Sequence, residues 1–454
     1  MRKQRSNKGI AISTDGLSDA DLAIFVLGVE SKLRHHFQLP PKEQLESARG
    51  NRTIFPAMIE GHFVEHDVYQ ATQLAAQHSF NTWLPLGVSR ESFDREFIRA
   101  LVTETAANAA DGHPFDFAKF KSELLRSLGS SRADWQYAIP VYFFDDPLLP
   151  SLEVGPVKFV RGPFIGKEIA FNDPRDQHLM EMLKELGAHK WLAVTSVAEA
   201  DFNAGYEKAH LATKLALAFL DLLANSRGYP NLRVLDDFHP QSRTYRAGFS
   251  ERLGVSGGTS SFYPHTSSEP GQTVSFLGTA QDEIAWVGQA LRMTNSLSAV
   301  TQFPRLKETW LTGLQFYGLG RDAREDSVGV IHYAAALDVT LARGTGSESI
   351  SEFLAFLLGR NVTDVVVSNP SLTVEELVYR IYSEGRSNSI HGGLPIISAD
   401  QSRNRVLGQA AARVALLTLI PPLKAYESGG VAPDDWDTFR KAKLRSQAKV
   451  NPRT

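Results

Sequence analysis

Cysteine is absent from the 454 residues of the chain. This absence excludes disulfide bonds, zinc sites built from thiolates and cysteine nucleophiles. A continuous apolar run of roughly 18 residues, the length that a membrane-spanning helix needs, is also missing. The longest apolar stretch, "VALLTLIPPL", contains two prolines and fits an amphipathic helix. With 43% hydrophobic residues, the sequence predicts a soluble protein with packed cores and no membrane partner.

Charge of one sign is not in excess either, because 48 Lys and Arg residues nearly balance 51 Asp and Glu residues. A nucleic-acid site must therefore be a local basic patch and not a property of the whole surface. The N-terminal run "MRKQRSNKGIAIS" is basic but lacks the apolar core of a secretory signal. We therefore expect a cytoplasmic protein.

The pattern of apolar residues divides the chain into four regions. Residues 1–130 show mostly helical periodicity, and residues 131–299 mix strand-like with helix-like segments. Within the second region, a Gly-, Ser- and Pro-rich stretch near 256–273 is expected to be an exposed loop. Residues 300–427 are expected to be a helical domain, and residues 428–454 a basic tail. The predicted fold is mainly α with a mixed α/β central region.

A strong helix start occurs near residue 373. Thr373 and Glu376 have the spacing of a capping box, and apolar residues then recur at helical spacing as far as Ile381. Gly385 should loosen this helix, and Gly392 should end it. The sequence thus predicts a helix that is irregular in its last turns.

Three polar side chains, Arg386, Asn388 and His391, lie near the end of this helix. A histidine, whose ordinary pKa is about 6.5, can transfer protons near neutral pH. An arginine offers a fork of donors that matches a phosphate group, and an asparagine adds a neutral donor. These groups suit a metal-free site that cleaves RNA by attack of the 2′-hydroxyl on the adjacent phosphate.

The spacing of Arg386 and His391 sets a geometric condition. On an ideal helix, five residues rotate by about 140°, so the two side chains would not share one face. Either the helix is distorted at Gly385, or the two residues meet across a dimer.

Four helical segments surround this motif in the last third of the chain. They are "EDSVGVIHYAAALDVTLARG", "SESISEFLAFLLGR", "TVEELVYRIYSEGRSNSIHGG" and "NRVLGQAAARVALLTLIPPLKAY". Their order, together with an arginine, a polar residue, a few variable residues and a histidine at a helix end, resembles the HEPN superfamily and, within it, the Apea-like HEPN group. The resemblance covers roughly residues 300–427.

The resemblance also implies roles for individual positions. Arg386 and His391 correspond to the motif arginine and histidine. Ser387 takes the position that is often Asn, Asp or His in the family, whereas the asparagine of this chain comes one residue later, at Asn388. Asp338, in "AAALDVTLA", corresponds to an acidic residue that is common in the first helix of the group.

A HEPN-like helical bundle implies a particular kind of enzyme. Its members are similar in acting as homodimers or higher homo-oligomers in which two motifs form one endoribonuclease site without a metal ion or cofactor. The resemblance implies an RNA substrate, with tRNA as one candidate, and a toxin-like or antiphage role. A protein or phage-derived trigger would then act through the N-terminal and central regions. Other HEPN domains are non-catalytic modules that bind nucleotides or proteins, and this alternative stays open.

A zinc hydrolase is a further alternative. His62, Glu65 and His66, in "HFVEH", match the H-x-x-E-H pattern, in which two histidines on one helical face bind zinc and the glutamate activates water. A later glutamate would have to be the third ligand, and Glu96 or Glu104 is available in a following predicted helix.

Two stretches concentrate basic residues and suit contacts with RNA phosphates. The first is the C-terminal tail, with Arg440, Lys441, Lys443, Arg445, Lys449 and Arg453. The second interleaves cations with aromatic residues and contains Arg243, Tyr245, Arg246 and Phe249. A solvated tail explains the first pattern equally well, and an ordinary β-hairpin surface explains the second.

Overall fold

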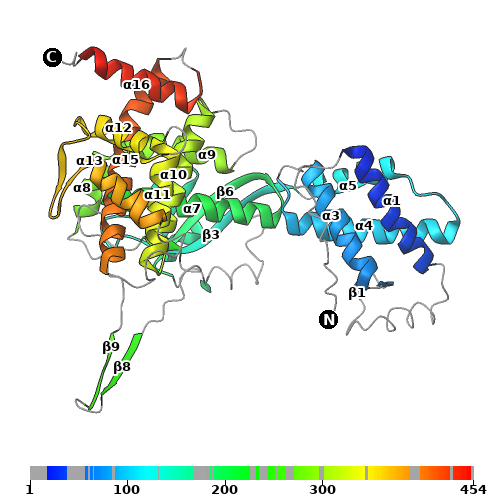
Figure 1. Ribbon diagram of the computed structural model, residues 1–454. Helices are drawn as coiled ribbons and strands as arrows, with labels where there is room; N and C mark the ends of the chain where they lie inside the picture. Colours follow the sequence, from blue (N-terminus) through cyan, green and yellow to red (C-terminus); the bar gives the residue numbers. More distant parts are fainter. Residues whose placement is uncertain are drawn as a thin grey trace, which may run out of the picture. The chain divides into compact units, whose positions relative to one another are not determined.

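The computed structural model divides the chain into two compact units (Figure 1). Unit 1 consists of Met1–Trp135 and Ala198–Glu207, and unit 2 of Gln136–Val197 and Lys208–Thr454. The structure describes residues 18–37, 57–59, 62–64, 66–83, 87–130, 132–167, 181, 184–185, 189–224, 232–234, 244–250, 254–260, 270–295, 301–342, 346–387, 399–429 and 433–450.

Unit 1 is mostly helical, as the sequence predicts. Its helices are α1 (Asp19–Phe37), α3 (His66–Trp83), α4 (Arg90–Asp111) and α5 (Phe117–Ser130). A short antiparallel hairpin joins β1 (Ala57–Ile59) to β2 (His62–Val64). The helices enclose aromatic side chains, among which Phe93, Phe97 and Phe120 are fully or almost fully buried.

Local capping fixes where these helices begin. Ser18 Oγ accepts a hydrogen bond from the backbone N–H of Asp21 at 3.2 Å at the start of α1. Ser89 Oγ accepts from Ser92 N at 3.1 Å at the start of α4, and Gly112 ends that helix in the left-handed conformation. Helix α1 thus begins directly after Ser18.

A five-stranded sheet has the strand order β4-β5-β6-β3-β7. Its strands are β3 (Ala133–Tyr142), β4 (Ser151–Val154), β5 (Val157–Arg161), β6 (Trp191–Ala200) and β7 (Arg233–Val234). Pairs β4–β5, β5–β6 and β3–β7 are antiparallel, with Val157 opposite Thr195 and Val141 opposite Val234. The short 3₁₀ helix η1 (Gly162–Lys167) follows β5. The predicted mixed α/β centre is confirmed.

The remaining elements of unit 2 are mainly helices. They are α7 (Phe202–Ala224), α8 (Gln272–Thr279), α9 (Gln281–Asn295), α10 (Pro304–Asp322), α11 (Asp326–Leu341), α12 (Ser347–Leu358), α13 (Val374–Tyr379), the π-helix η3 (Arg380–Ser387), α15 (Ala399–Ser428) and α16 (Trp436–Val450). Two hairpins complete it, β8 (Thr244–Ser250) with β9 (Gly254–Ser260), and β10 (Val365–Ser368) with β11 (Ser371–Thr373).

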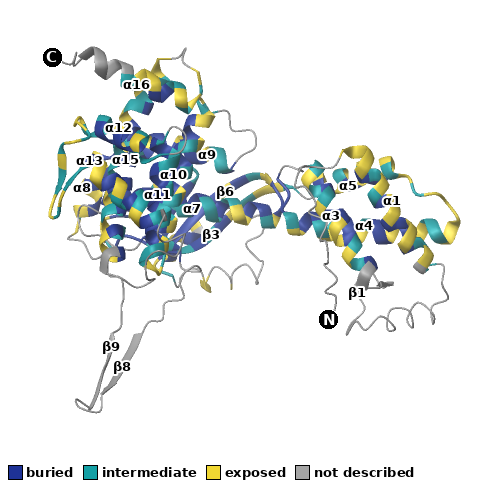
Figure 2. Cartoon of the chain, in the orientation of Figure 1, coloured by how far each residue is buried: buried dark blue, intermediate teal, exposed yellow. Residues whose placement is uncertain are grey.

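One core joins the central and C-terminal regions of unit 2. The Trp310 ring lies 6.3 Å from Phe219 of α7 and 5.2 Å from Trp286 of α9, and its Nε1 donates to Leu416 O of α15 at 3.1 Å. Figure 2 shows buried residues on α7, α10 and α11. Residues 300–427 therefore do not form a domain separate from residues 131–299, because their apolar faces pack on each other.

Helix α15 lies within this core. Among the described residues, its segment Gln401–Ser428 alone is long and apolar enough to cross a membrane, and a buried core helix meets the same criterion. Ala415, Leu419 and Leu423 are almost or completely buried inside unit 2. The helix continues through Pro421 and Pro422. Its contacts are those of a core helix.

The prediction of an exposed loop near 256–273 is wrong for the residues of this stretch that the structure describes. Gly254–Ser260 forms β9, which pairs with β8 so that Gly248 lies opposite Ser256, and α8 begins at Gln272. Backbone pairing with β8, which carries Tyr245 and Phe249, outweighs the low strand preference of the Gly and Ser residues. Residues 261–269 lie outside the described residues.

The hairpin β10–β11 interrupts a region that the sequence predicts to be helical throughout. Val365, Val366 and Val367 are β-branched, and Pro370 follows them in the turn. A run of valines ended by Asn-Pro is a strand signal that sequence reasoning missed.

The expected basic tail at 428–454 contains the helix α16. Phe439 is fully buried, and Trp436 Nε1 donates to Thr340 O of α11 at 3.2 Å. These two aromatic side chains pack the helix against the rest of unit 2, so Trp436–Val450 of the basic tail is helical.

Candidate active site

The predicted helix start at Thr373 is confirmed in detail. Thr373 Oγ1 accepts from Glu376 N at 3.2 Å, and Glu376 Oε2 accepts from Thr373 N at 2.8 Å, which is a complete capping box. The α-helical part, α13, is short, and the chain continues directly into η3. Helices with hydrogen bonds from i to i+5 are rare and occur frequently at functional sites. The helix that precedes His391 is thus distorted.

Gly385 permits this distortion. A Cβ atom at Gly385 would lie 2.5 Å from Val330 Cγ1 and 3.3 Å from Arg380 O. Val330 is fully buried on α11, so it has no free space into which to move. Only a residue without a side chain lets η3 lie this close to α11.

Arg386 pairs with Asp338, the acidic residue singled out on α11. Arg386 Nη1 lies 3.4 Å from Asp338 Oδ2, and the two side chains are 31% and 30% exposed. The guanidinium also lies over the ring of Tyr382, 5.0 Å from its centroid. Arg386 makes no other ion pair with the part of the chain that the structure describes, so most of its donors have no partner among those residues.

Arg386 and Asp338 are the two predicted site residues that the structure brings together. Asn388 and His391 lie outside the described residues, as does the side chain of Ser387. Sequence reasoning missed Tyr382. Its position four residues before Arg386 is the spacing at which helical side chains meet, and this signal was available.

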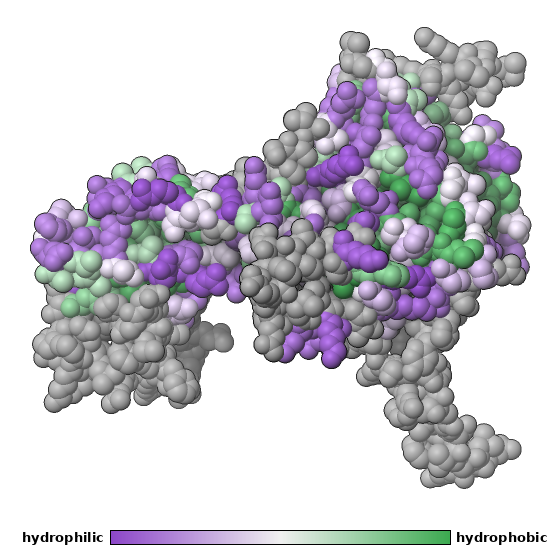
Figure 3. All heavy atoms as spheres, turned by 180° about the vertical axis from the view of Figure 1, so that it is seen from behind, coloured by the Kyte–Doolittle hydropathy of each residue, from purple (hydrophilic) through white to green (hydrophobic). Residues whose placement is uncertain are grey.

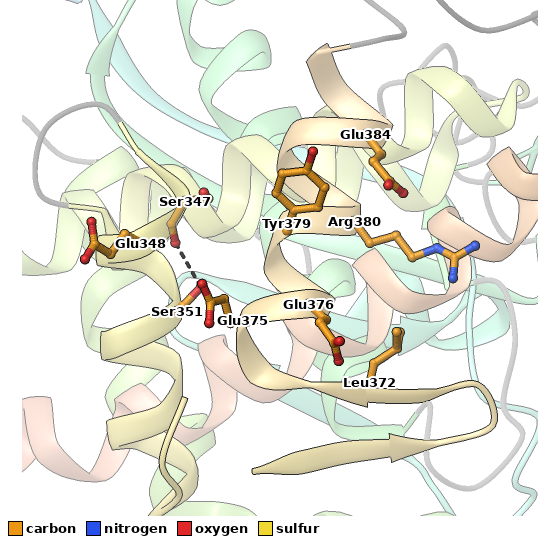
Figure 4. A pocket seen from close by; sticks show the side chains of 9 residues that line it. All are labelled: Ser347, Glu348, Ser351, Leu372, Glu375, Glu376, Tyr379, Arg380 and Glu384. Atoms are coloured by element: carbon orange, nitrogen blue, oxygen red, sulfur yellow. Dashed lines mark hydrogen bonds between the residues drawn. The ribbon is translucent and has the colours of Figure 1, made fainter. Parts of the chain in front are cut away.

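An acidic pocket of about 510 Å³ lies beside η3 (Figure 4). Its carboxylates come from Glu348, Glu375, Glu376 and Glu384. Its one cation, Arg380, donates through Nε to Asn404 Oδ1 of α15 at 2.9 Å. Four carboxylates repel a polyanion, so this pocket does not suit the binding of phosphate groups.

Arg405 of α15 bonds to the connection between α10 and α11 and to the first residue of α11. Its Nη1 lies 3.0 Å from Asp326 Oδ1, and its Nη2 donates to Ala323 O at 2.8 Å. The hydrogen bond from the Ser402 hydroxyl holds the pKa of the Asp326 carboxyl below its ordinary value, and the Arg405 guanidinium lowers this pKa further. These bonds fix the start of the helix that carries Val330 and Asp338.

The zinc-hydrolase hypothesis required two histidines on one helix. His62 instead belongs to strand β2, whereas His66 is the first residue of α3, and Glu65 lies outside the described residues. The H-x-x-E-H pattern therefore does not form a helical face here, because His62 lies in a strand and His66 in a helix.

The two basic stretches differ in what the structure describes of them. Arg440 is almost completely buried: its Nη2 donates to Ser349 O at 2.5 Å, and its guanidinium lies 5.0 Å from the Phe353 centroid. Arg440 thus stabilises the packing of α16 on α12 and is not available to phosphate. In the second stretch, Arg246 lies on β8 of the expected hairpin, and Arg243 lies outside the described residues.

No protein-family model, curated protein or solved structure matches this chain. The HEPN resemblance therefore depends on the sequence motif and on the order of the predicted helices.

Proposed function

We propose that this protein is a metal-independent endoribonuclease of the HEPN type. The observation that carries the proposal is the pairing of Arg386 with Asp338, which lie 48 residues apart and were both singled out from the sequence. Arg386 lies on the distorted helix η3, which precedes His391 in the sequence, and Asp338 lies on α11. This arrangement keeps an arginine fork half-exposed and oriented, as binding of a phosphate requires.

The proposed reaction needs only groups of this chain and the RNA. The ribose 2′-oxygen attacks the adjacent phosphorus, its proton passes to a base, and the bond to the 5′-oxygen breaks as that oxygen receives a proton from an acid. His391 is the proposed proton-transfer group, Arg386 neutralises the charge on the phosphoryl oxygens, and Asn388 adds a neutral donor. One product ends in a 2′,3′-cyclic phosphate and the other begins with a 5′-hydroxyl.

A homo-oligomer is part of the proposal, because base and acid can then come from two copies of His391. The support is an apolar groove of about 420 Å³ that β10, α12 and α15 line. Val365 in this groove is 56% exposed, and Figure 3 shows hydrophobic side chains gathered on one face of unit 2. Light scattering of the purified protein is expected to give the mass of a dimer or a larger assembly.

The decisive experiment is RNA cleavage in the presence of EDTA. Wild-type protein is expected to cleave, and His391→Ala and Arg386→Ala are expected to lose cleavage. Arg403→Ala is the matched control, because Arg403 is an exposed arginine of α15 without an ion pair among the described residues. His62→Ala should cleave like wild type. Equal cleavage by His391→Ala and wild type, or intact RNA with wild type under every trigger tested, contradicts the proposal.

We further propose a toxin-like or antiphage role in the cytoplasm, with tRNA among the substrates. Expression of the protein with and without infection, followed by sequencing of RNA 5′-hydroxyl ends, tests this role. The His391→Ala variant supplies the background.

A further inference from the structure

Unit 1 contains a concave site of its own, and no residue of the proposed nuclease lines it. A pocket of about 490 Å³ is lined by side chains from α4, α5, the start of β3 and the start of α7. Pockets of about 300–1,000 Å³ are the usual size for small-molecule sites.

One wall of this pocket is aromatic. Phe202 is 57% exposed, and its ring centroid lies 5.3 Å from that of Trp135 at an interplanar angle of 82°. Trp135 Nε1 donates to Ala200 O at 2.9 Å, which fixes the indole plane. An exposed phenyl ring held against a fixed indole presents a flat face on which a planar ligand can stack.

The pocket also contains a cation that is free to bind a ligand. Arg95 is exposed and makes no hydrogen bond or ion pair with any residue that the structure describes. The Glu96 carboxylate of the lining lies 2.5 Å from Arg99 Nη2. The other acid, Asp201, accepts the backbone N–H groups of Ser89 at 2.8 Å and of Ala204 at 2.7 Å.

Both acids of the lining therefore already accept hydrogen bonds or pair with a described residue, whereas Arg95, in the same lining as the aromatic rings, has no such partner among the described residues. Asn203, with a donor and an acceptor in one amide, also lines the pocket and suits the polar edge of a base. An aromatic face for stacking, an arginine for phosphate and an amide for base edges are the groups with which proteins bind single nucleotides.

We propose that this pocket binds a nucleotide, with its base on Phe202 and Trp135 and its phosphate at Arg95. The nucleotide is either free or the end of a single-stranded RNA. The inference does not depend on the nuclease proposal, because the pocket and the motif lie in different units and are tested by different readouts.

Isothermal titration of the full chain tests the pocket with four nucleoside monophosphates, the matching nucleosides and a short single-stranded oligonucleotide. Arg95→Ala is expected to lower the affinity for monophosphates at least tenfold and to leave nucleoside affinity unchanged. Phe202→Leu should lower the affinity for both at least fivefold, since stacking on an aromatic ring contributes about 1–3 kcal/mol per base. Arg126→Ala, an exposed arginine of α5 outside the pocket lining, should bind like wild type.

Binding of monophosphates with this pattern supports a free nucleotide, and the same pattern with the oligonucleotide alone supports an RNA end. Absence of binding to all of these ligands at millimolar concentrations overturns the proposal. The proposal is also overturned if the Arg95→Ala and Phe202→Leu variants bind these ligands with wild-type affinity. Circular dichroism of each variant checks the fold, and RNA cleavage by Arg95→Ala shows separately whether the Arg386 site is intact.

Discussion

The Arg386 guanidinium is held between a carboxylate and an aromatic ring. Asp338 and Tyr382 contact it from different elements, α11 and η3, and so limit the directions in which its free donors point. Ion pairs with this degree of exposure contribute only about 0–1 kcal/mol to stability. The effect of Asp338 should thus be on orientation and not on folding.

Substitutions at these two residues separate the two effects. Arg386→Ala should lower the cleavage rate by about 10²–10³, the usual loss on removal of a charge-stabilising donor. Asp338→Asn should lower the cleavage rate less than Arg386→Ala does. The free energy of unfolding of the Asp338→Asn variant should differ from that of wild type by less than about 1 kcal/mol. Single-turnover cleavage and urea unfolding measure the two quantities. A cleavage rate of wild-type magnitude in Asp338→Asn would remove Asp338 from the site.

Asp146 is a single side chain that organises the start of α8. It is fully buried, and it accepts the backbone N–H groups of Leu148, Gly271 and Thr273, each at 3.0 Å. Burial raises the pKa of this carboxyl, but the backbone hydrogen bonds lower it more, so the pKa is below its ordinary value. The ionised form is therefore the one that stabilises the fold.

The sign of the pH dependence follows from that lowered pKa. The contribution of Asp146 is complete above the unfolded-state pKa of about 3.9 and is lost as the pH falls through the folded-state value. At neutral pH, Asp146→Asn should lower the free energy of unfolding by about 2 kcal/mol, because one charged acceptor is lost. Below the folded-state pKa the difference from wild type should shrink. Denaturant unfolding at several pH values measures it, and a difference that does not change with pH would contradict the assignment.

Among the elements, helix starts and a distortion at Gly385 were predictable, but the π-helical form of that distortion was not. The bonds between Thr373 and Glu376 are made within four residues, so the sequence alone specifies them. The widened turn of η3 depends on a contact between Gly385 and Val330, 55 residues earlier in the chain, which no local pattern reveals. The Arg386–Asp338 pair is equally non-local. The family resemblance pointed to each of the two residues separately, but their pairing was not predicted.

Gly385→Ala tests whether close packing positions the site. The new methyl group would lie 2.5 Å from Val330 Cγ1, so η3 must move away from α11 and carry Arg386 with it. Cleavage should fall at least tenfold, with a loss of stability of about 1–3 kcal/mol from overpacking.

The double variant Gly385→Ala/Val330→Ala is the control for that test. It removes the clashing methyl group, because the next Val330 atom lies 3.8 Å from the added Cβ. Its cleavage rate should be higher than that of the single variant Gly385→Ala. If it recovers none, close packing at this point does not position Arg386.

For the whole molecule, the sequence predicted the helical and mixed character of the chain but not its division into units. The expected boundary at residue 130 lies close to the observed one after Trp135. The ten residues Ala198–Glu207 belong to unit 1 although they lie far along the chain, and only folding brings them there. The expected boundary at residue 299 lies inside unit 2, where the contacts of Trp310 join both sides.

A fragment of residues 1–135 should therefore be an incomplete unit 1. It lacks Asp201, which bonds Ser89 at the start of α4, and Ala200 O, which accepts the Trp135 indole N–H. We expect the fragment to unfold at least about 5 °C below the same fragment with residues 198–207 attached through a flexible linker, since a domain of this size shifts by about 2–4 °C per kcal/mol. Thermal unfolding followed by circular dichroism measures the difference. Equal melting temperatures would show that the ten residues are not needed.

The path of the chain between the units also restricts how such a protein can be recombined. It passes from one unit to the other after Trp135, Val197 and Glu207, and each of these points lies inside β3, β6 or α7. Genes exchange contiguous stretches, so a single crossover cannot transfer either unit whole. Replacing unit 1 of this protein by that of another would need three junctions, each in register within a strand or helix.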